Sequence, residues 1–142
     1  EGFTLGHYPQ SFEFSTLGGW ISARSAGQQS NRYGKIEKLV SCVRLVSPEG
    51  ILETRDFPAS AAGPDLNQTI CGSEGSFGFI TEAVVKIHRI PSQKIYHAAL
   101  MPNFGSGRDA IHSLIRKEVK LAMTRLSDET ETTMFLTLKK MK

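Results

Sequence analysis

A run of closely spaced glycines is the feature of this sequence best suited to holding a ligand. Gly72, Gly75 and Gly78 recur at every third position, with Ser73 and Ser76 between them. Glycine lets the backbone turn tightly and approach a ligand that side chains would push away. Successive exposed N–H groups in such a turn can bind phosphate oxygens. The run predicts a backbone-lined binding turn, although an ordinary connecting loop is an alternative that the spacing alone leaves open.

A second stretch, from Ser15 to Gly27, carries the glycine pair Gly18-Gly19 among small and hydroxyl-bearing residues. It suits close packing of backbone on a flat or phosphorylated ligand, but a tight turn capped by Ser and Thr would have the same composition. Trp20 is expected to pack in the core, since its neighbours are apolar. Arg24 is expected either to pair with a phosphate or to make a structural ion pair.

The chain of 142 residues has 39% hydrophobic and 22% charged residues, as in an ordinary globular domain. Its net charge of +3 is spread along the chain, apart from a basic end, which argues against nucleic-acid binding. No apolar run is long enough to span a membrane. Cys42 and Cys71 are expected to be free, buried thiols. The histidines and cysteines lack metal-ligand spacing, so no metal is predicted.

The elements around the two motifs predict an α+β fold. An apolar, β-branched segment over 36–46 and its return over 51–55 flank a Ser-Pro-Glu-Gly turn and predict a hairpin. A short extended piece is expected over 11–16 and a strand over 79–90, ended by Pro91; strands are also expected over 94–101 and 121–126. Helices are expected over 20–28, 64–70, 106–117 and 128–136. Because the order of elements changes there, Pro91 is the expected boundary between two units.

Four stretches of the chain resemble the alkylglycerone-phosphate synthase family, which belongs to the FAD-linked oxidases of the vanillyl-alcohol-oxidase type. They are Pro9–Ser22, Arg32–Glu37, Gly63–Leu66 and Gly72–Glu82, in the family's order and at similar spacing. The glycine run is shared by the wider superfamily, whereas Phe12 to Trp20 is more particular to the synthases. The family often has an arginine shortly before Gly63, where this chain has Ala59-Ser60.

The resemblance implies that residues 1–91 are the second subdomain of a PCMH-type FAD-binding domain and that residues 92–142 begin an α/β cap domain over the substrate. Arg125 would lie near the start of that cap, where a structural or solvated role is expected. The implied contacts to FAD come from two turns and the segments beside them. These residues are Pro9, Gln10, Ser11, Phe12, Glu13, Phe14, Ser15, Thr16, Gly18, Gly19, Ser22, Ala23, Arg24, Ser25, Gly72, Ser73, Glu74, Gly75, Ser76, Phe77, Gly78, Ile80 and Thr81.

The family reaction exchanges the acyl group of acyl-dihydroxyacetone phosphate for a fatty alcohol, with a flavin nitrogen as the nucleophile. The family's pyrophosphate loop would precede Glu1, and its acid–base tyrosine and histidine cluster would follow Lys142. We therefore expect this chain to be a fragment that contains no catalytic residue. It is expected to bind FAD weakly or not at all by itself and to self-associate through its exposed cofactor face. The parent would be cytoplasmic, or peroxisomal in a eukaryote.

Two other functions remain open at the level of sequence. The same fold could belong to an FAD-linked dehydrogenase or oxidase of a 2-hydroxy acid, which shares the glycine run but not the Phe12 to Trp20 stretch. The chain could also be a truncated flavin-fold module without catalysis.

Overall fold

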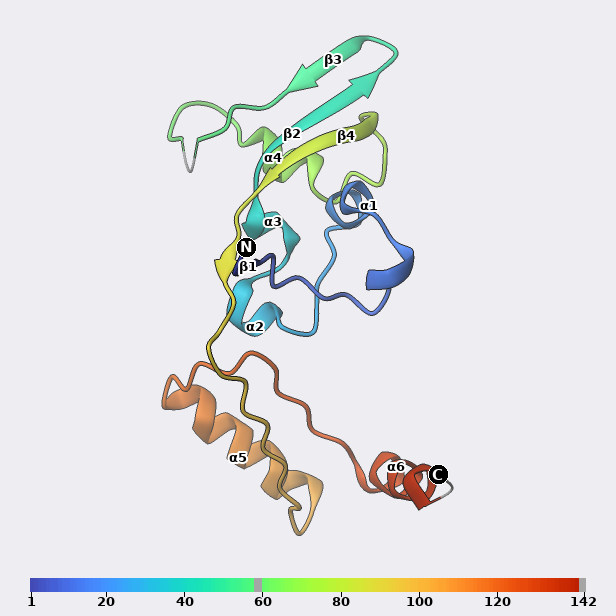
Figure 1. Ribbon diagram of the computed structural model, residues 1–142, viewed down its shortest axis with the longest axis vertical. Helices are drawn as coiled ribbons and strands as arrows, with labels where there is room; N and C mark the ends of the chain where they lie inside the picture. Colours follow the sequence, from blue (N-terminus) through green and yellow to red (C-terminus); the bar gives the residue numbers. More distant parts are fainter. Residues whose placement is uncertain (58–59, 141–142) are drawn as a thin grey trace. The chain divides into compact units, whose positions relative to one another are not determined.

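The computed structural model describes residues 1–57 and 60–140 and divides the chain into two units, Glu1–Pro91 and Ser92–Lys142 (Figure 1). Ala59, which stands near the family's arginine position, and the last two residues of the basic end lie outside the described residues. Both units contain helices, and the strands belong to the first, so the α+β prediction is confirmed.

The centre of the first unit is an antiparallel sheet in the order β3–β2–β4. β2 (Val40–Ser47) and β3 (Gly50–Glu53) form the predicted hairpin, which closes where Ser47 faces Gly50. β4 (Phe79–Val85) lies along the other edge of β2. A separate ribbon joins β1 (Phe3–Thr4) to β5 (His88–Arg89). The pairing of Phe79 with Val46 thus brings the end of the glycine run beside the end of β2 next to the hairpin turn.

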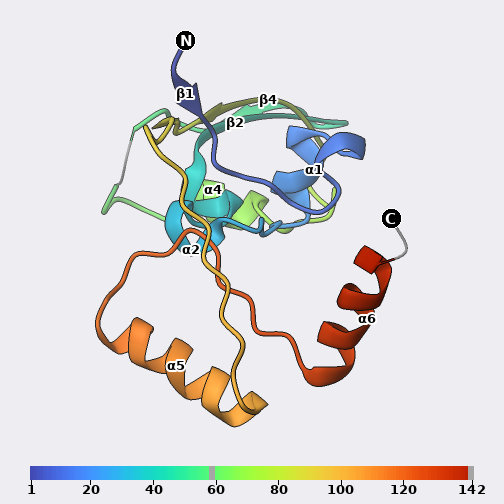
Figure 2. The ribbon, with the colours of Figure 1, turned by 60° about the horizontal axis from the view of Figure 1, so that its bottom comes forward.

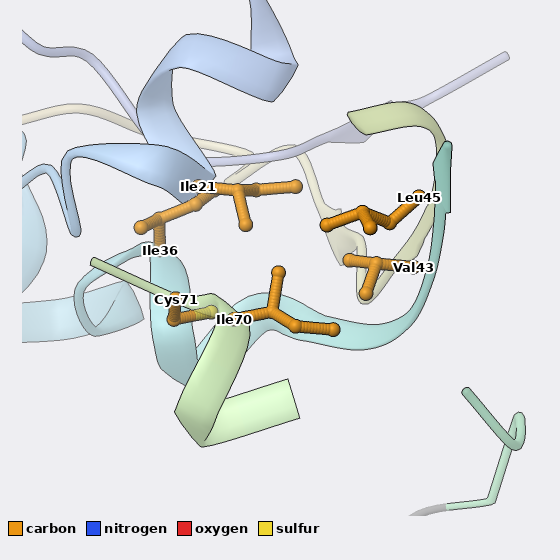
Figure 3. Packing of buried hydrophobic residues seen from close by; sticks show 6 residues of the cluster. All are labelled: Ile21, Ile36, Val43, Leu45, Ile70 and Cys71. Carbon is orange, nitrogen blue, oxygen red and sulfur yellow. The ribbon is translucent and has the colours of Figure 1, made fainter. Parts of the chain in front are cut away.

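Short helices cover one face of this sheet, as Figure 2 shows for α1 and α4 beneath β2 and β4. They are α1 (Leu17–Ser22), α3 (Ile36–Leu39) and α4 (Leu66–Ile70). The 3₁₀ turn η1 (Phe12–Phe14) precedes α1, and α2 (Ser30–Tyr33), which has no buried residue, lies between α1 and α3 in the sequence. The apolar side chains of α1, α3 and α4 meet those of β2 in one core, shown in Figure 3, whose buried members are Ile21, Ile36, Val43, Leu45, Ile70 and Cys71. Burial of each large aliphatic side chain stabilises the fold by about 1.5–3 kcal/mol.

A buried polar cluster fastens α4 to β2. Thr54 Oγ1 accepts the backbone N–H of Val43 at 2.9 Å and donates to Asn67 Oδ1 at 2.6 Å. The amide of Asn67 donates in turn to the carbonyl of Ser41 at 2.8 Å. Because these buried groups satisfy one another, the start of the glycine run, which follows α4, is held against the sheet.

The second unit consists of α5 (Phe104–Arg116) and α6 (Glu129–Lys140) with irregular segments before and between them. Asn103 caps α5 by accepting the N–H of Ser106, and Asp128 accepts the N–H of Glu131 at the start of α6. Side-chain caps of this kind define where a helix begins. Both predicted helices are present, close to their expected bounds. None of the helices in the described part of the chain has the length and apolarity needed to cross a bilayer.

Several predicted elements of the first unit were wrong in type or bounds. The helix expected over 20–28 begins at Leu17 instead, because Thr16 Oγ1 accepts the N–H of Gly19 and so caps the helix before the glycine pair. The extended piece expected over 11–16 contains η1. The strand expected over 36–46 opens with the helical turn α3, and the one over 79–90 is divided into β4 and β5.

The strands expected over 94–101 and 121–126 are absent; both segments are irregular. A strand needs a neighbour to take up its backbone hydrogen bonds, and neither segment has a paired strand among the described residues. Leu126 packs on α5 instead, so closely that a Cβ on Gly107 would lie 2.6 Å from its methyl carbon.

Candidate functional site

The first of the two glycine-bearing turns is built on α1. Gly18 faces β4, where a Cβ would lie 3.2 Å from the carbonyl oxygen of Ile80. α1 ends at Ser22, and Arg24 then adopts a left-handed backbone with φ of +49°. The N–H groups of Ala23, Arg24 and Ser25 all bond to carbonyls of α1. This turn therefore offers side chains, chiefly the hydroxyls of Ser22 and Ser25, rather than free backbone donors.

The second turn, from Gly72 to Gly78, is rich in residues with positive φ. Gly72, Glu74, Gly75 and Gly78 all have positive φ, between +49° and +137°. Turns that contain such residues can present backbone N–H groups to an anion. Among the described residues, the N–H groups of Gly75 and Phe77 have no hydrogen-bond partner, unlike those of the other residues in the turn.

The three glycines of this run play different parts. A Cβ on Gly72 would lie 2.9 Å from Nε of Arg24, and a Cβ on Gly78 would collide with the carbonyl of Val46, so both are needed for packing. Nothing lies within 4 Å of the corresponding position on Gly75. Gly75 therefore leaves a bare stretch of backbone on the open side of the turn.

The structure brings the two turns together. The carbonyls of Ile21 and Ser22 accept the N–H groups of Gly72 and Glu74, both at 3.0 Å. The expected juxtaposition of the two glycine-bearing turns is present, and it follows from packing of α1 against β4 and of α4 against β2. The paired turns include two of the three non-glycine residues with positive φ in the described part of the chain, Arg24 and Glu74. Strained backbone of this kind gathers at ligand sites.

Arg24 clamps the two turns to each other. Its Nε and Nη2 donate to the carbonyl of Cys71, 47 residues away, at 3.1 and 2.6 Å, and Nη2 also donates to the carbonyl of Gln68 at 2.7 Å. Among the described residues Arg24 thus makes structural hydrogen bonds to backbone carbonyls and not the ion pair that was one of the two expected roles. The guanidinium instead satisfies carbonyls at the end of α4, as Arg does well with its planar set of donors.

The segment Pro9–Ser15 lies beside α1 through an aromatic and hydroxyl cluster. Trp20 Nε1 donates to Ser15 Oγ at 2.6 Å, and Ser15 Oγ donates to the carbonyl of Ser11 at 2.6 Å. Phe12 stacks on Trp20 with ring centroids 5.8 Å apart. Trp20 is thus a packing residue, as the sequence suggested. Phe14, with 91% of its surface exposed, is left free.

The end of the glycine run passes into β4 beside α1. A hollow of about 50 Å³ is lined by Leu17, Gly18 and residues 80–83. It holds little more than a water molecule and is far smaller than a flavin. The register of β2 and β4 shifts at Thr81, whose hydroxyl donates to the carbonyl of Arg44 at 3.3 Å.

His7 is a site residue that sequence reasoning missed, because the histidines were weighed only as metal ligands. It is 1% exposed, and its Nε2 lies 2.7 Å from Ser25 Oγ. Burial lowers the pKa of His7, and the negative charge of Glu37 opposes this with a smaller effect.

Burial raises the pKa of the Cys71 thiol, an effect that the charge of Arg24 reduces. Cys42 and Cys71 are both free and buried, as expected.

Arg125, in the second unit, has structural contacts. It pairs with Glu131 on α6, and its guanidinium lies 5.4 Å from the ring centre of Phe135. Hydrogen bonds from Ser127 first, and then from Arg125, lower the pKa of Glu131. These contacts agree with the structural role expected for Arg125.

Comparison with known proteins gives a consistent result. Residues 1–55 match the FAD binding domain family. Alkyldihydroxyacetonephosphate synthases of Trypanosoma brucei brucei and Dictyostelium discoideum are 47% and 45% identical to this chain over 92% and 93% of its length. This chain is homologous to those synthases. It spans 21–22% of their length.

The fold agrees with a solved structure of an alkyldihydroxyacetonephosphate synthase. That structure superposes with a TM-score of 0.75 and 42% identity over 86% of this chain, which corresponds to 22% of the synthase chain. FAD-linked oxidoreductases, including 2-hydroxy-acid dehydrogenases and a glycolate oxidase subunit, match at 29–32% identity. The synthase homologues are thus clearly the more similar group.

Proposed function

We propose that this chain supplies one wall of the FAD site of an alkylglycerone-phosphate synthase-like enzyme. The observation that carries the proposal is the direct backbone pairing of the two glycine-bearing turns, from Ile21 and Ser22 to Gly72 and Glu74. Homology to the synthases, closer than to the oxidoreductases, supports the choice of reaction.

The residues of the paired turns suit a flavin nucleotide. Phosphate oxygens and flavin carbonyls are hydrogen-bond acceptors, and the turns offer donors: the N–H groups of Gly75 and Phe77 and the hydroxyls of Ser22 and Ser25. The bare backbone at Gly75 lets a ligand approach closely. We assign contacts to FAD to Pro9–Ser15, Ser22–Ser25 and Gly72–Gly78, with Ile80 and Thr81 toward the flavin end. Arg24 belongs to this set as a clamp between the turns.

The reaction we propose for the whole enzyme joins acyl-dihydroxyacetone phosphate and a fatty alcohol. It yields alkyl-dihydroxyacetone phosphate and releases the fatty acid. FAD, when bound, supplies the nucleophile for this substitution. The part of this chain is to bind and orient the cofactor, and we assign it no catalytic side chain.

We assign residues 1–91 to the FAD-binding domain and 92–142 to the beginning of the cap domain over the lipid-like substrate. Location in the cytoplasm, or in the peroxisome of a eukaryote, and homo-oligomer formation stay predictions. A 2-hydroxy-acid oxidoreductase is the second candidate, favoured only by the shared glycine run, and a non-catalytic module is the third.

The deciding experiment uses the longest natural protein that contains this chain, loaded with FAD. We expect it to transfer labelled hexadecanol into alkyl-dihydroxyacetone phosphate while fatty acid is released. Reduction of an acceptor dye with lactate or glycolate, without alcohol transfer, would favour the oxidoreductase. Neither activity, with FAD bound, would favour the non-catalytic module.

The isolated chain is tested by titration with FAD, followed by flavin fluorescence. Because this chain spans only 21–22% of the synthases and would supply part of the pocket, the cofactor would stay hydrated and we expect binding weaker than micromolar. Submicromolar affinity would contradict the view that much of the pocket is contributed by other parts of the protein.

A further inference from the structure

His7 lies where the first cofactor segment meets the first turn. The chain around it runs along residues 25–28: the N–H of Gln28 donates to the carbonyl of Tyr8 at 2.9 Å, and a Cβ on Gly27 would lie 2.6 Å from the nitrogen of Tyr8. This close approach brings His7 Nε2 to 2.7 Å from Ser25 Oγ. His7 is buried, whereas Ser25 is partly exposed, so Ser25 remains accessible to a ligand.

The surroundings of the ring decide which nitrogen carries its proton. His7 Nδ1 is buried and has no hydrogen-bond partner in the described part of the chain. Glu37, whose negative charge affects the pKa of His7, makes neither a hydrogen bond nor an ion pair with the imidazole ring. A buried N–H without a partner is rarer and more costly than an unpaired acceptor. The proton therefore belongs on Nε2, which then donates to Ser25 Oγ.

We propose that His7 is a positioning residue that makes Ser25 a hydrogen-bond donor to the flavin nucleotide. When Nε2–H occupies a lone pair of Ser25 Oγ, the hydroxyl hydrogen turns away from His7, toward the open side of the turn. An acceptor oxygen of a flavin nucleotide is the partner that this orientation suits. The inference rests on the proposed function, because it needs FAD at the paired turns.

His7 also contacts the side chain that holds the first segment. Its ring packs edge-on against Trp20, with centroids 5.2 Å apart, and Trp20 Nε1 donates to Ser15 Oγ. The buried ring of His7 thus contacts Ser25 directly, and it packs against Trp20, which in turn donates a hydrogen bond to Ser15. Only the contact to Ser25 is a hydrogen bond, and that contact is the one a substitution can remove while leaving the aromatic packing in place.

The experiment is a double-mutant cycle on FAD affinity of the 142-residue chain, with His7→Phe, Ser25→Ala and the double variant. His7→Phe keeps an aromatic ring against Trp20 but cannot donate. Because one hydrogen bond is worth roughly 0.5–1.5 kcal/mol, each single variant should weaken binding about 2- to 10-fold. The double variant should bind no more weakly than Ser25→Ala, since His7 acts through Ser25.

Two controls separate positioning from packing. His7→Gln, whose amide can donate to Ser25, should restore most of the affinity. His88→Phe alters the other poorly exposed histidine of this unit, which packs on Tyr33 and has no contact with Ser25, and should leave the affinity unchanged. Effects of His7→Phe that persist in full in the Ser25→Ala background would overturn the proposal while FAD binding itself stands.

The tautomer is measured separately, from imidazole nitrogen shifts of the unsubstituted chain, so it holds even where His7→Phe fails to fold. A proton on Nε2 supports the proposal, and a proton on Nδ1 overturns it. Where the unsubstituted chain binds no FAD up to the solubility of the cofactor, the same cycle is measured on the longest natural protein that contains it; absence of FAD binding there would contradict the proposed function, and the inference with it.

Discussion

The two units of this chain are stabilised in different ways. Every buried hydrophobic side chain of the described residues lies in the first unit, from Ile21 to Cys71. Among the described residues of the second unit only Gly107 is buried, while large apolar side chains of both helices are exposed, among them Ile115 at 67% and Met134 at 57%.

Because of this difference, a preorganised binding site is expected in the first unit. The paired turns stand on a core that joins α1, α3, α4 and β2, so their backbone is fixed before any ligand binds. The second unit has helices defined by local caps, at Asn103 and Asp128, and little apolar burial of its own. Helices of this length are marginal without packing. We therefore expect the first unit to dominate cooperative unfolding.

The largest expected effect contrasts a core residue of the first unit with an apolar helix residue of the second. Ile21→Ala removes a fully buried side chain and should destabilise the first unit by about 2–5 kcal/mol. Leu114→Ala, at a position 38% exposed, should change stability by less than about 0.5 kcal/mol. Urea unfolding followed by Trp20 fluorescence measures both. Equal losses would show that the second unit shares the same core.

The next comparison lies within the glycine run. Gly78→Ala places a methyl against the carbonyl of Val46 at a left-handed φ and should cost about 2–4 kcal/mol. Gly75→Ala faces open space and carries only the backbone penalty of about 1 kcal/mol. Thermal unfolding of the two variants checks this order. A reversal would mean that Gly75, not Gly78, is the packing glycine.

The elements that the sequence predicts correctly are those encoded by local signals. The hairpin, α4, α5 and α6 were predicted, because turn residues, caps and helical spacing are all encoded locally. The juxtaposition of the turns, which the family resemblance implied, is present.

What failed depended on tertiary contacts. The strand over 94–101 needed a partner that the described chain does not offer. The clamp formed by Arg24 needed the carbonyl of Cys71, far away in sequence. The contact between His7 and Ser25 forms because two loops pass close to each other, and no pattern in the spacing of residues along the sequence predicts it.

A smaller effect is expected from the clamp itself. Arg24→Lys keeps the charge but cannot reach the carbonyls of Gln68 and Cys71 together, so about 1 kcal/mol should be lost. The matched control is Arg44→Lys, in an ion pair with Glu82 on the exposed side of the sheet, which should cost less than about 0.5 kcal/mol. Chemical unfolding measures both. A loss of stability for Arg24→Lys as small as that for Arg44→Lys would show that Arg24 does not hold the two turns together.

The smallest effect is a pH dependence that belongs to the first unit. Because burial lowers the pKa of His7 in the folded chain, the unfolded chain binds the proton more readily. Stability should therefore be greatest above about pH 6.5 and fall as the pH drops below it. Unfolding free energies measured between about pH 8 and about pH 5 test this. His7→Phe should lose this part of the dependence; an unchanged profile would assign it to other groups.

The central claim is that the paired turns of the first unit form the flavin-binding surface. It is tested most directly by amide proton–nitrogen correlation spectra of the isotope-labelled chain during titration with FAD, which report weak binding residue by residue. We expect the largest changes in amide chemical shift at Gly75 and Phe77, with further changes at Ser22 and Ser25. Binding that leaves these amides unmoved, and shifts those of α5 or α6 instead, would contradict it.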